Sequence, residues 1–235
     1  MEIFYCKQDD SIFPQLLKDI KNSPKGLYYC GDISILNKIP CLAIVGSRAA
    51  SANGRKIAFE FGRMAAEKGF VVVNGLAVGC DTHALMGALS INGKCATVMP
   101  GGLDAVYPRS NIDLSQEILH KGGCLISEYG VGVRPQKHTF VNRDRLQSGL
   151  SQGVVVIETT QKGGTMHTVD FAEAQGRRLA CYYSKISQME SGNRIIIDNY
   201  DGVPVENEDD MERFLKELKS HKTEHYEQLT LDIKY

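Results

Sequence analysis

The sequence has little net charge and lacks the patterns of a secreted or membrane-spanning protein. Its 27 basic and 28 acidic residues leave a formal net charge of -1. Bulk electrostatics therefore favour no polyanionic partner, and any anion site must be local. No run of about eighteen apolar residues occurs, and the first ten residues show no basic stretch followed by an apolar one. We expect neither secretion nor membrane spanning.

Cysteine is present but forms no recognisable pattern. The seven cysteines are an odd number and include no C-x-x-C pair, and several lie beside apolar runs. They are interpreted as reduced thiols in the hydrophobic core of a cytoplasmic protein. A chain of 235 residues, 43% of them hydrophobic, can bury such a core without disulfides or metals.

The short motifs of common cofactor sites and active sites are also missing. The sequence has no G-x-G-x-x-G, no G-x-x-x-x-G-K-[ST], no G-x-S-x-G and no recognisable pair of catalytic carboxylates. Its six histidines do not have metal-ligand spacing. These absences disfavour a dinucleotide cofactor and a P-loop ATPase and offer little for catalysis, so we expect neither a cofactor nor a metal.

Short apolar runs alternate with helical patterns along most of the chain. This alternation predicts an α/β fold, an extended Rossmann-like parallel sheet with helices on both faces. The predicted strands are 42–45, 70–73, 96–99, 124–126, 154–157 and 179–182, and the predicted helices between them are 52–68, 82–91, 111–121, 141–150 and 166–175. Ser51 or Asn53, Asp81 and Thr165 are the candidate caps for three of these helices.

Three parts of the chain are expected. Residues 1–40 are expected to form a small appendage with a helix at 12–20 and a strand at 27–30. Residues 41–200 are expected to form the Rossmann-like core. Residues 201–235 are expected to form an acidic tail with a strand at 202–205 and a helix at 209–220. Residues 41–150 hold twelve basic and eight acidic residues, against five and eleven in 198–235. The middle of the chain is therefore basic, and the acidic tail is interpreted as a solvated helix.

Glycine-containing turns follow four of the predicted strands. In parallel sheets such turns meet at the carboxyl edge, where exposed backbone N–H groups at helix starts suit phosphate. Tight strand-to-helix turns often need glycine for structural reasons alone, so the four together carry the prediction. The turns contain Gly46-Ser47-Arg48, Gly75 to Gly79, Pro100-Gly101-Gly102 and Lys162-Gly163-Gly164-Thr165.

Charged and aromatic residues near these turns are the other candidates. Arg48 offers a planar set of donors to a phosphate, although pairing with a surface carboxylate is an equal alternative. Phe140 could stack on a base, or could simply be a core residue. Arg143 and Arg145 differ by about 200° around a helix, so mid-helix they could not both face one phosphate. They could serve the same site only at the irregular start of the helix, or by meeting different phosphates of one strand. Asp81 is interpreted as a cap rather than a catalytic group.

At these residues the sequence resembles the DNA processing protein A family (DprA, also called Smf). The resemblance covers about residues 13–200 and includes Ala43 to Arg48, Gly75 to Ala84, Gly102-Leu103-Asp104 with Val106-Tyr107-Pro108, Phe140 with Arg143 and Arg145, Gly163-Gly164-Thr165 and Ala172 to Arg177. It implies a dimeric, non-enzymatic protein that binds and protects single-stranded DNA. It also implies help in loading a RecA-type recombinase during natural transformation and recombination.

The resemblance places certain residues in a DNA-phosphate groove. By position they are Ser47, Arg48, Gly79, Lys137, Phe140, Arg143 and Arg145. Beside Phe140 the family pattern is arginine-rich with an asparagine between two arginines. Here Asn142 replaces an arginine and Asp144 replaces that asparagine, a change expected to weaken phosphate binding and its salt dependence. A full helical domain before the sheet and a winged helix after it are not recognised, so a core-only member is expected.

Two other hypotheses remain at this point. The first is a Rossmann-type phosphoribohydrolase that cleaves nucleoside monophosphates, although neither Pro100-Gly101-Gly102 nor Gly163-Gly164-Thr165 continues into the acidic loop of such enzymes. The second is a nucleotide-sensing scaffold that holds a small phosphate ligand and binds another protein. Binding to DNA, release of free base from AMP, or binding of mononucleotides alone would separate the three.

Overall fold

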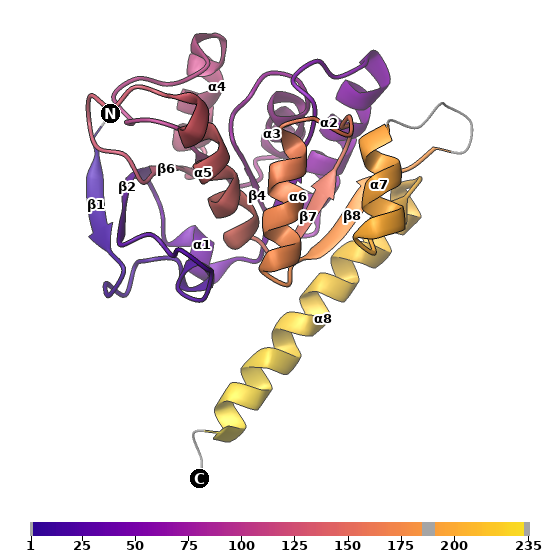
Figure 1. Ribbon diagram of the computed structural model, residues 1–235. Helices are drawn as coiled ribbons and strands as arrows, with labels where there is room; N and C mark the ends of the chain where they lie inside the picture. The colour runs from indigo at the N-terminus through magenta and orange to yellow at the C-terminus, as the bar shows by residue number, and fades with distance from the viewer. Residues whose placement is uncertain (1, 185–190, 233–235) are drawn as a thin grey trace.

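The computed structural model describes residues 2–184 and 191–232. Within these ranges nine strands form one sheet in the order β1-β2-β6-β5-β4-β3-β7-β8-β9 (Figure 1). The strands are β1 (Phe4–Lys7), β2 (Gly26–Gly31), β3 (Cys41–Val45), β4 (Val71–Asn74), β5 (Cys95–Val98), β6 (Cys124–Ser127), β7 (Gly153–Val156), β8 (Arg178–Tyr182) and β9 (Val203–Val205). Strands β3 to β9 are parallel, and β1 and β2 are antiparallel additions.

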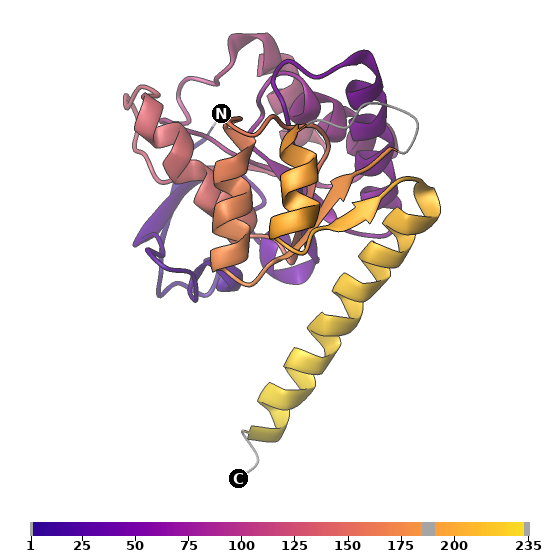
Figure 2. The same ribbon diagram turned by 45° about the vertical axis from the view of Figure 1, so that its right-hand side comes forward.

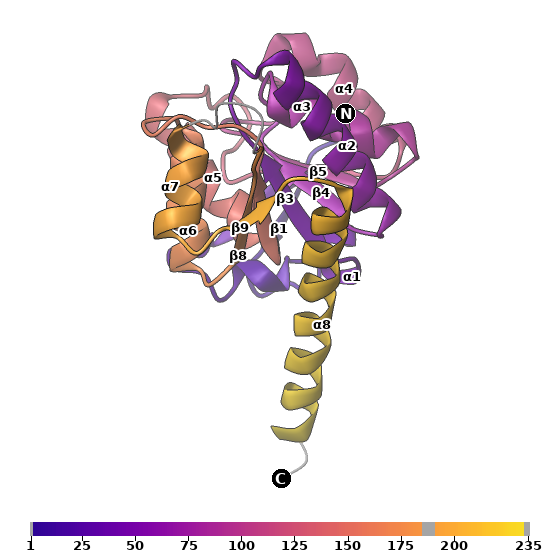
Figure 3. The same cartoon turned by 90° about the vertical axis from the view of Figure 1, so that its right-hand side faces the viewer.

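Helices cover both faces of this sheet. They are α1 (Ile35–Lys38), α2 (Ala52–Glu67), α3 (Cys80–Ser90), α4 (Ile112–His120), α5 (Lys137–Gly149), α6 (Thr165–Ala174), α7 (Ser191–Asn199) and α8 (Glu208–Asp232), with short 3-10 helices η1 (Gln15–Leu17) and η2 (Arg109–Asn111). Figure 3 shows α5, α6 and α7 on one side of the sheet and α2, α3, α4 and the start of α8 on the other. The predicted α/β fold is confirmed.

The alternation of side chains along β3 explains how both faces are packed. Leu42 and Ile44 belong to the hydrophobic cluster that includes Phe61 of α2 and Leu85 of α3. Ala43 and Val45 belong instead to the cluster formed with α6 and α7. Successive residues of a strand point to opposite faces, so a run apolar at every position is buried on both sides. All seven cysteines are buried free thiols, as the sequence predicted.

Two strands before residue 40, β1 and β2, extend the sheet. β2 pairs with β6, and β1 pairs with β2 as the edge strand. Phe13, Leu17 and Leu27 are completely buried in one cluster with Leu146 of α5. The helix predicted at 12–20 is wrong, because only Gln15–Leu17 forms a 3-10 turn. Strand β1, helix α1 and helix α7 were not predicted.

The acidic tail contains a longer helix than the predicted 209–220. Met211, Phe214, Leu215 and Leu218 of α8 pack into the cluster shared with α2. Their spacing of three and four residues gives the start of α8 one apolar stripe. The helix continues to Asp232 and extends away from the body of the protein (Figure 2).

Only one of the three predicted helix caps is confirmed. The Ser51 hydroxyl accepts a hydrogen bond from the Gly54 amide at 2.9 Å and so caps α2. Asp81 is not the N-cap of α3, since Gly79 holds that position. Thr165 is the first residue of α6 rather than its cap, which is Gly164. The exposed glycine at the start of α6 leaves that helix end without a side-chain cap.

Candidate functional site

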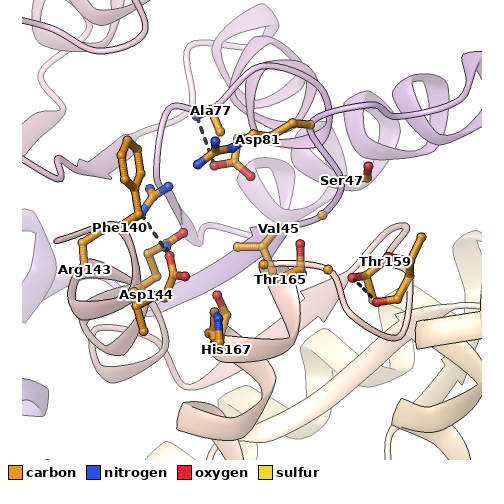
Figure 4. Close-up of a pocket in the computed structure, with 18 of the residues that line it drawn as sticks. Val45, Ser47, Ala77, Asp81, Phe140, Arg143, Asp144, Thr159, Thr165 and His167 are labelled. Carbon is orange, nitrogen blue, oxygen red and sulfur yellow. Dashed lines mark hydrogen bonds and ion pairs between the residues drawn. The ribbon is translucent and has the colours of Figure 1, made fainter. Parts of the chain in front are cut away.

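The turns after β3 and β7 meet the first half of α5 at the carboxyl edge of the sheet. Between them lies a cleft of about 480 Å³, called here the central cleft. Figure 4 shows Phe140, Arg143 and Asp144 of α5 on one wall, with Thr159 and Thr165 across the cleft. This is the edge at which parallel sheets usually bind ligands.

Most of the residues predicted to form a phosphate site line the central cleft. They are Gly46, Ser47, Arg48, Lys137, Phe140, Arg143, Gly163, Gly164 and Thr165. Four others do not line it, namely Gly75, Gly79, Arg145 and Lys162. Gly101 and Gly102 of the remaining turn lie against the loop before α5 instead. A Cβ there would come within 2.8 Å of the Val133 carbonyl oxygen or 2.4 Å of the Gly130 carbonyl oxygen.

Two of the glycines that do not line the cleft leave room for residues that do. A Cβ on Gly75 would lie 1.0 Å from Nη1 of Arg143, so this glycine makes the space that the guanidinium occupies. Gly79 has a φ of +83°, and a Cβ there would lie 2.3 Å from the Ser47 carbonyl oxygen. Gly79 therefore allows the turn before α3 to contact the turn that carries Arg48.

Arg48 and Phe140 form a cation–π pair at the central cleft. The guanidinium carbon of Arg48 lies 5.0 Å from the centre of the Phe140 ring. Arg48 is exposed, and Phe140 is half-buried. At the start of α5, the Thr139 hydroxyl accepts a hydrogen bond from the Gln136 amide at 2.9 Å, which fixes the turn that carries Phe140. The pair offers a cation and an aromatic surface side by side.

Arg143 is a buried cation at the base of the cleft. Its side chain is 6% exposed, and Nη1 donates a hydrogen bond to the Val98 carbonyl oxygen at 3.3 Å. Nε lies 3.0 Å from Oδ1 of Asp144 as an ion pair, but without hydrogen-bond geometry. The Nε–H group of this buried guanidinium is therefore without a hydrogen-bond acceptor within the protein.

Two buried carboxyl groups accompany these cations. Burial raises the pKa of Asp144 to about 6, although Arg143 opposes the rise. Burial also raises the pKa of Asp81, again against the attraction of Arg143. Oδ2 of Asp81 accepts hydrogen bonds from the amides of Gly75 at 3.0 Å and Ala77 at 3.2 Å. Asp81 thus holds the β4–α3 turn, which is why it does not cap α3.

Arg145 points to a different part of the protein. Its Nη2 donates to both carboxylate oxygens of Glu128 at 2.7 Å, and Nη1 donates to the Asn22 carbonyl oxygen at 2.6 Å. These contacts fasten α5 to the segment that follows β6 and to the turn after η1. The helical separation predicted for Arg143 and Arg145 is the reason that only Arg143 reaches the cleft.

The cleft also contains residues that the sequence did not single out. Gln147 and His167 line it, and Nε2 of Gln147 donates to Oδ1 of Asp144 at 2.7 Å. His167 lies two residues after Thr165, so its position near the predicted start of the helix was the one feature of the sequence that could have pointed to it.

Within residues 2–184 and 191–232, no group of histidine, cysteine, aspartate or glutamate side chains is arranged to hold a metal ion. Over the same residues, no helix is long and apolar enough to cross a membrane.

Comparisons with known proteins assign the chain to a family. A family described as DNA recombination-mediator protein A matches residues 4–216. DNA processing protein DprA of Streptococcus pneumoniae is 39% identical over 168 residues, which are 72% of this chain and 58% of that protein. Protein Smf of Synechocystis is 35% identical over 176 residues, 74% of this chain and 44% of that protein.

Solved structures agree with the sequence matches. DNA processing protein A of Helicobacter pylori superposes with a TM-score of 0.80 at 27% identity, covering 92% of this chain and 96% of that one. The S. pneumoniae structure also gives a TM-score of 0.80, at 32% identity, over 89% of this chain and 73% of that one. The chain therefore belongs to the DNA recombination-mediator protein A family.

Proposed function

We propose that the chain binds single-stranded DNA in the central cleft and acts in recombination and DNA uptake. The observation that carries the proposal is the Arg48–Phe140 pair, which lies in one cleft with Arg143 and the start of α6. A cation for a phosphate and an aromatic ring for a base are the two elements that hold single strands with little sequence preference. The H. pylori relative has a single-stranded DNA binding mode.

The size and charge of the cleft support a single strand as the ligand. A volume of about 480 Å³ suits a short stretch of single strand, whose phosphate and base can enter separately, whereas a duplex keeps its bases stacked inside. In the described part of the chain, the arginine and lysine side chains that line the cleft are Arg48, Lys137 and Arg143. Three phosphate contacts predict that log Kobs falls with log salt with a slope of roughly -2 for a single strand.

We also propose that the cleft binds without catalysis. Its two carboxyl groups already have structural partners, since Asp81 accepts two backbone amides and Asp144 contacts Arg143 and Gln147. Neither is free to act as a nucleophile, and the family match favours DNA over the nucleoside monophosphates of the phosphoribohydrolase hypothesis. From the resemblance to the DprA family, we also propose that a homodimer in the cytoplasm protects the strand and assists a RecA-type recombinase.

Fluorescence anisotropy with a labelled oligothymidylate tests the binding site. Arg48→Ala is expected to weaken binding by about 5- to 30-fold, because it removes one charge-assisted phosphate contact of roughly 1–2 kcal/mol. Lys56→Ala, which removes an exposed cation of α2 outside the cleft, is the matched control and is expected to bind like the parental protein.

Gly164→Ala provides a steric test at the start of α6. No atom lies within 4 Å of a Cβ added at Gly164, and its φ of -58° suits alanine, so the substitution is expected to leave the fold intact. If a phosphate approaches this helix end, the new methyl group obstructs it, and affinity is expected to fall about tenfold. Unchanged binding by both Arg48→Ala and Gly164→Ala would overturn the proposed site.

A further inference from the structure

A second, smaller hollow lies directly beside the central cleft. Its volume is about 140 Å³, and it shares Arg48, Phe140 and Arg143 with the cleft. Its remaining wall comes from two loops, with Val78 after β4 and Tyr107 after β5. We call it the Tyr107 hollow. The shared residues make the two cavities neighbours across one wall, so a chain-like ligand in the cleft could continue into this hollow.

Tyr107 is held close to Phe140 but is left open to a ligand. The two ring centres are 5.5 Å apart with an interplanar angle of 68°. Tyr107 remains 44% exposed, and Val78 beside it is 41% exposed. An edge-to-face contact with Phe140 orients the ring without covering the whole of it.

The loop that carries Tyr107 is fixed to the neighbouring loop by a buried side chain. Nδ2 of Asn111, in η2, donates to the Leu76 carbonyl oxygen and to the Thr82 hydroxyl, both at 2.8 Å. These bonds join the β5 loop to the β4–α3 loop, which also supplies Val78. The two walls of the hollow therefore keep their spacing, and an exposed ring on a fixed support loses little conformational entropy when it binds.

The chemistry of the Tyr107 hollow favours a nucleobase. No carboxylate lines it in the described part of the chain, and its open surfaces are aromatic and aliphatic. The guanidinium groups of Arg48 and Arg143 lie at the boundary with the central cleft, where a phosphate joining two nucleotides would meet them. Aromatic side chains stack on bases of any identity, so this arrangement lengthens the site without adding sequence preference.

We propose that Tyr107 forms a second base-stacking subsite, in which the strand held in the central cleft passes the Arg48–Phe140 pair and places its next base against Tyr107 and Val78. This proposal rests on the proposed function of the same cleft. It assigns a distinct role to each side of the pair, with phosphates held mainly by the cleft and a base held by the hollow.

Tyr107→Ala, Tyr107→Phe and Tyr5→Ala test the subsite in anisotropy titrations with oligothymidylate. Tyr107→Ala is expected to bind roughly 5- to 100-fold more weakly, as for loss of one stacked base. Tyr107→Phe keeps the ring and is expected to bind like the parental protein. Tyr5 is a matched control because it is 49% exposed, pairs with Tyr28 at 4.8 Å, and lines neither cavity. A thermal melt of each variant reports whether it is folded.

Two further measurements separate base stacking from loss of charge or fold. On an oligonucleotide with abasic sites throughout, the parental protein and Tyr107→Ala are expected to bind equally, and the salt slope of Tyr107→Ala should match the parental slope. The sequence has no tryptophan, so Tyr107→Trp introduces a single reporter. Its fluorescence is expected to be quenched by oligothymidylate and much less by the abasic strand.

The outcomes distinguish this proposal from the proposed function. If the parental protein binds oligothymidylate and Arg48→Ala weakens binding, but folded Tyr107→Ala binds like the parental protein, the subsite is overturned and the cleft stands. Equal weakening of Tyr107→Ala on thymidylate and abasic strands would also overturn base stacking. Failure of the parental protein to bind single-stranded DNA would overturn both proposals.

Discussion

Replacing Asp144 with asparagine should tighten DNA binding and stabilise the fold at neutral pH. The carboxyl group is buried beside Arg143 in the central cleft, and burial raises its pKa from 3.8 to about 6. At neutral pH it is therefore an anion in a site proposed for phosphate. Asparagine has almost the same shape and keeps a carbonyl oxygen for Gln147, but it carries no charge.

The direction of the stability effect follows from the raised pKa. A group whose pKa is higher in the folded state favours folding while it is protonated, so its contribution is complete below about pH 4. That contribution is lost as the pH rises through about 6. A rise from 3.8 to about 6 corresponds to roughly 3 kcal/mol in the free energy of unfolding. Asp144→Asn is thus expected to be more stable than the parental protein by up to about 3 kcal/mol above pH 7, and by little at pH 4.

The binding effect follows from the same charge. Removing an anion near a bound phosphate relieves a repulsion of roughly 1–2 kcal/mol at a partly solvated site, which is about 5- to 30-fold in affinity. The advantage of Asp144→Asn should shrink below about pH 6, where the parental carboxyl group takes up a proton.

Anisotropy titrations with oligothymidylate between about pH 5 and 8, paired with urea denaturation at the same pH values, measure both effects. An affinity ratio that does not depend on pH would refute the assignment of a raised pKa to Asp144. Binding no tighter than the parental protein at pH 7.5 would show that this carboxyl group does not face the bound phosphates.

The remaining predictions concern the supports of the cleft. Gly75→Ala places a Cβ 1.0 Å from Nη1 of Arg143, so the guanidinium must move, and we expect binding to weaken at least tenfold with about 1–3 kcal/mol of lost stability; a crystal structure showing Arg143 in place and normal anisotropy would contradict this. Arg145→Ala breaks the pair of bonds to Glu128 and is expected to cost about 3 kcal/mol in urea unfolding, while the salt slope of DNA binding in the folded variant stays unchanged; a smaller slope would place Arg145 among the phosphate contacts.

The sequence predicted the core of the fold well because the central strands are apolar on both faces. β3, β4, β5, β6 and β7 are buried at every position, and such runs, separated by helical patterns, have few other structures available. β1 was missed because only Cys6 of its four residues is buried. An edge strand with three exposed positions lacks the apolar signal on which the prediction depends.

The sequence indicated which residues lie near the cleft better than it indicated the contacts that each of them makes. Helical geometry excluded a shared phosphate for Arg143 and Arg145 only in mid-helix, and both remained candidates for the DNA groove; in the structure Arg143 lines the cleft, whereas Arg145 pairs with Glu128. The role of Gly75 depends on where the Arg143 guanidinium lies, which is a contact between residues far apart in sequence. Asp81 was misassigned as a cap for the same reason, because its carboxylate accepts amides from the preceding turn. The contact between Tyr107 and Phe140 depends on the path of the loop after β5, which the sequence pattern does not define.

If Arg48, Lys137 and Arg143 hold the phosphates of a single strand at the carboxyl edge of the sheet, the affinity for oligothymidylate must depend on salt. We expect a slope of log Kobs against log salt of roughly -2 for the parental protein, and a slope smaller in magnitude by about 0.7 for Arg48→Ala. A parental slope near zero, or a slope that Arg48→Ala leaves unchanged, would contradict this expectation.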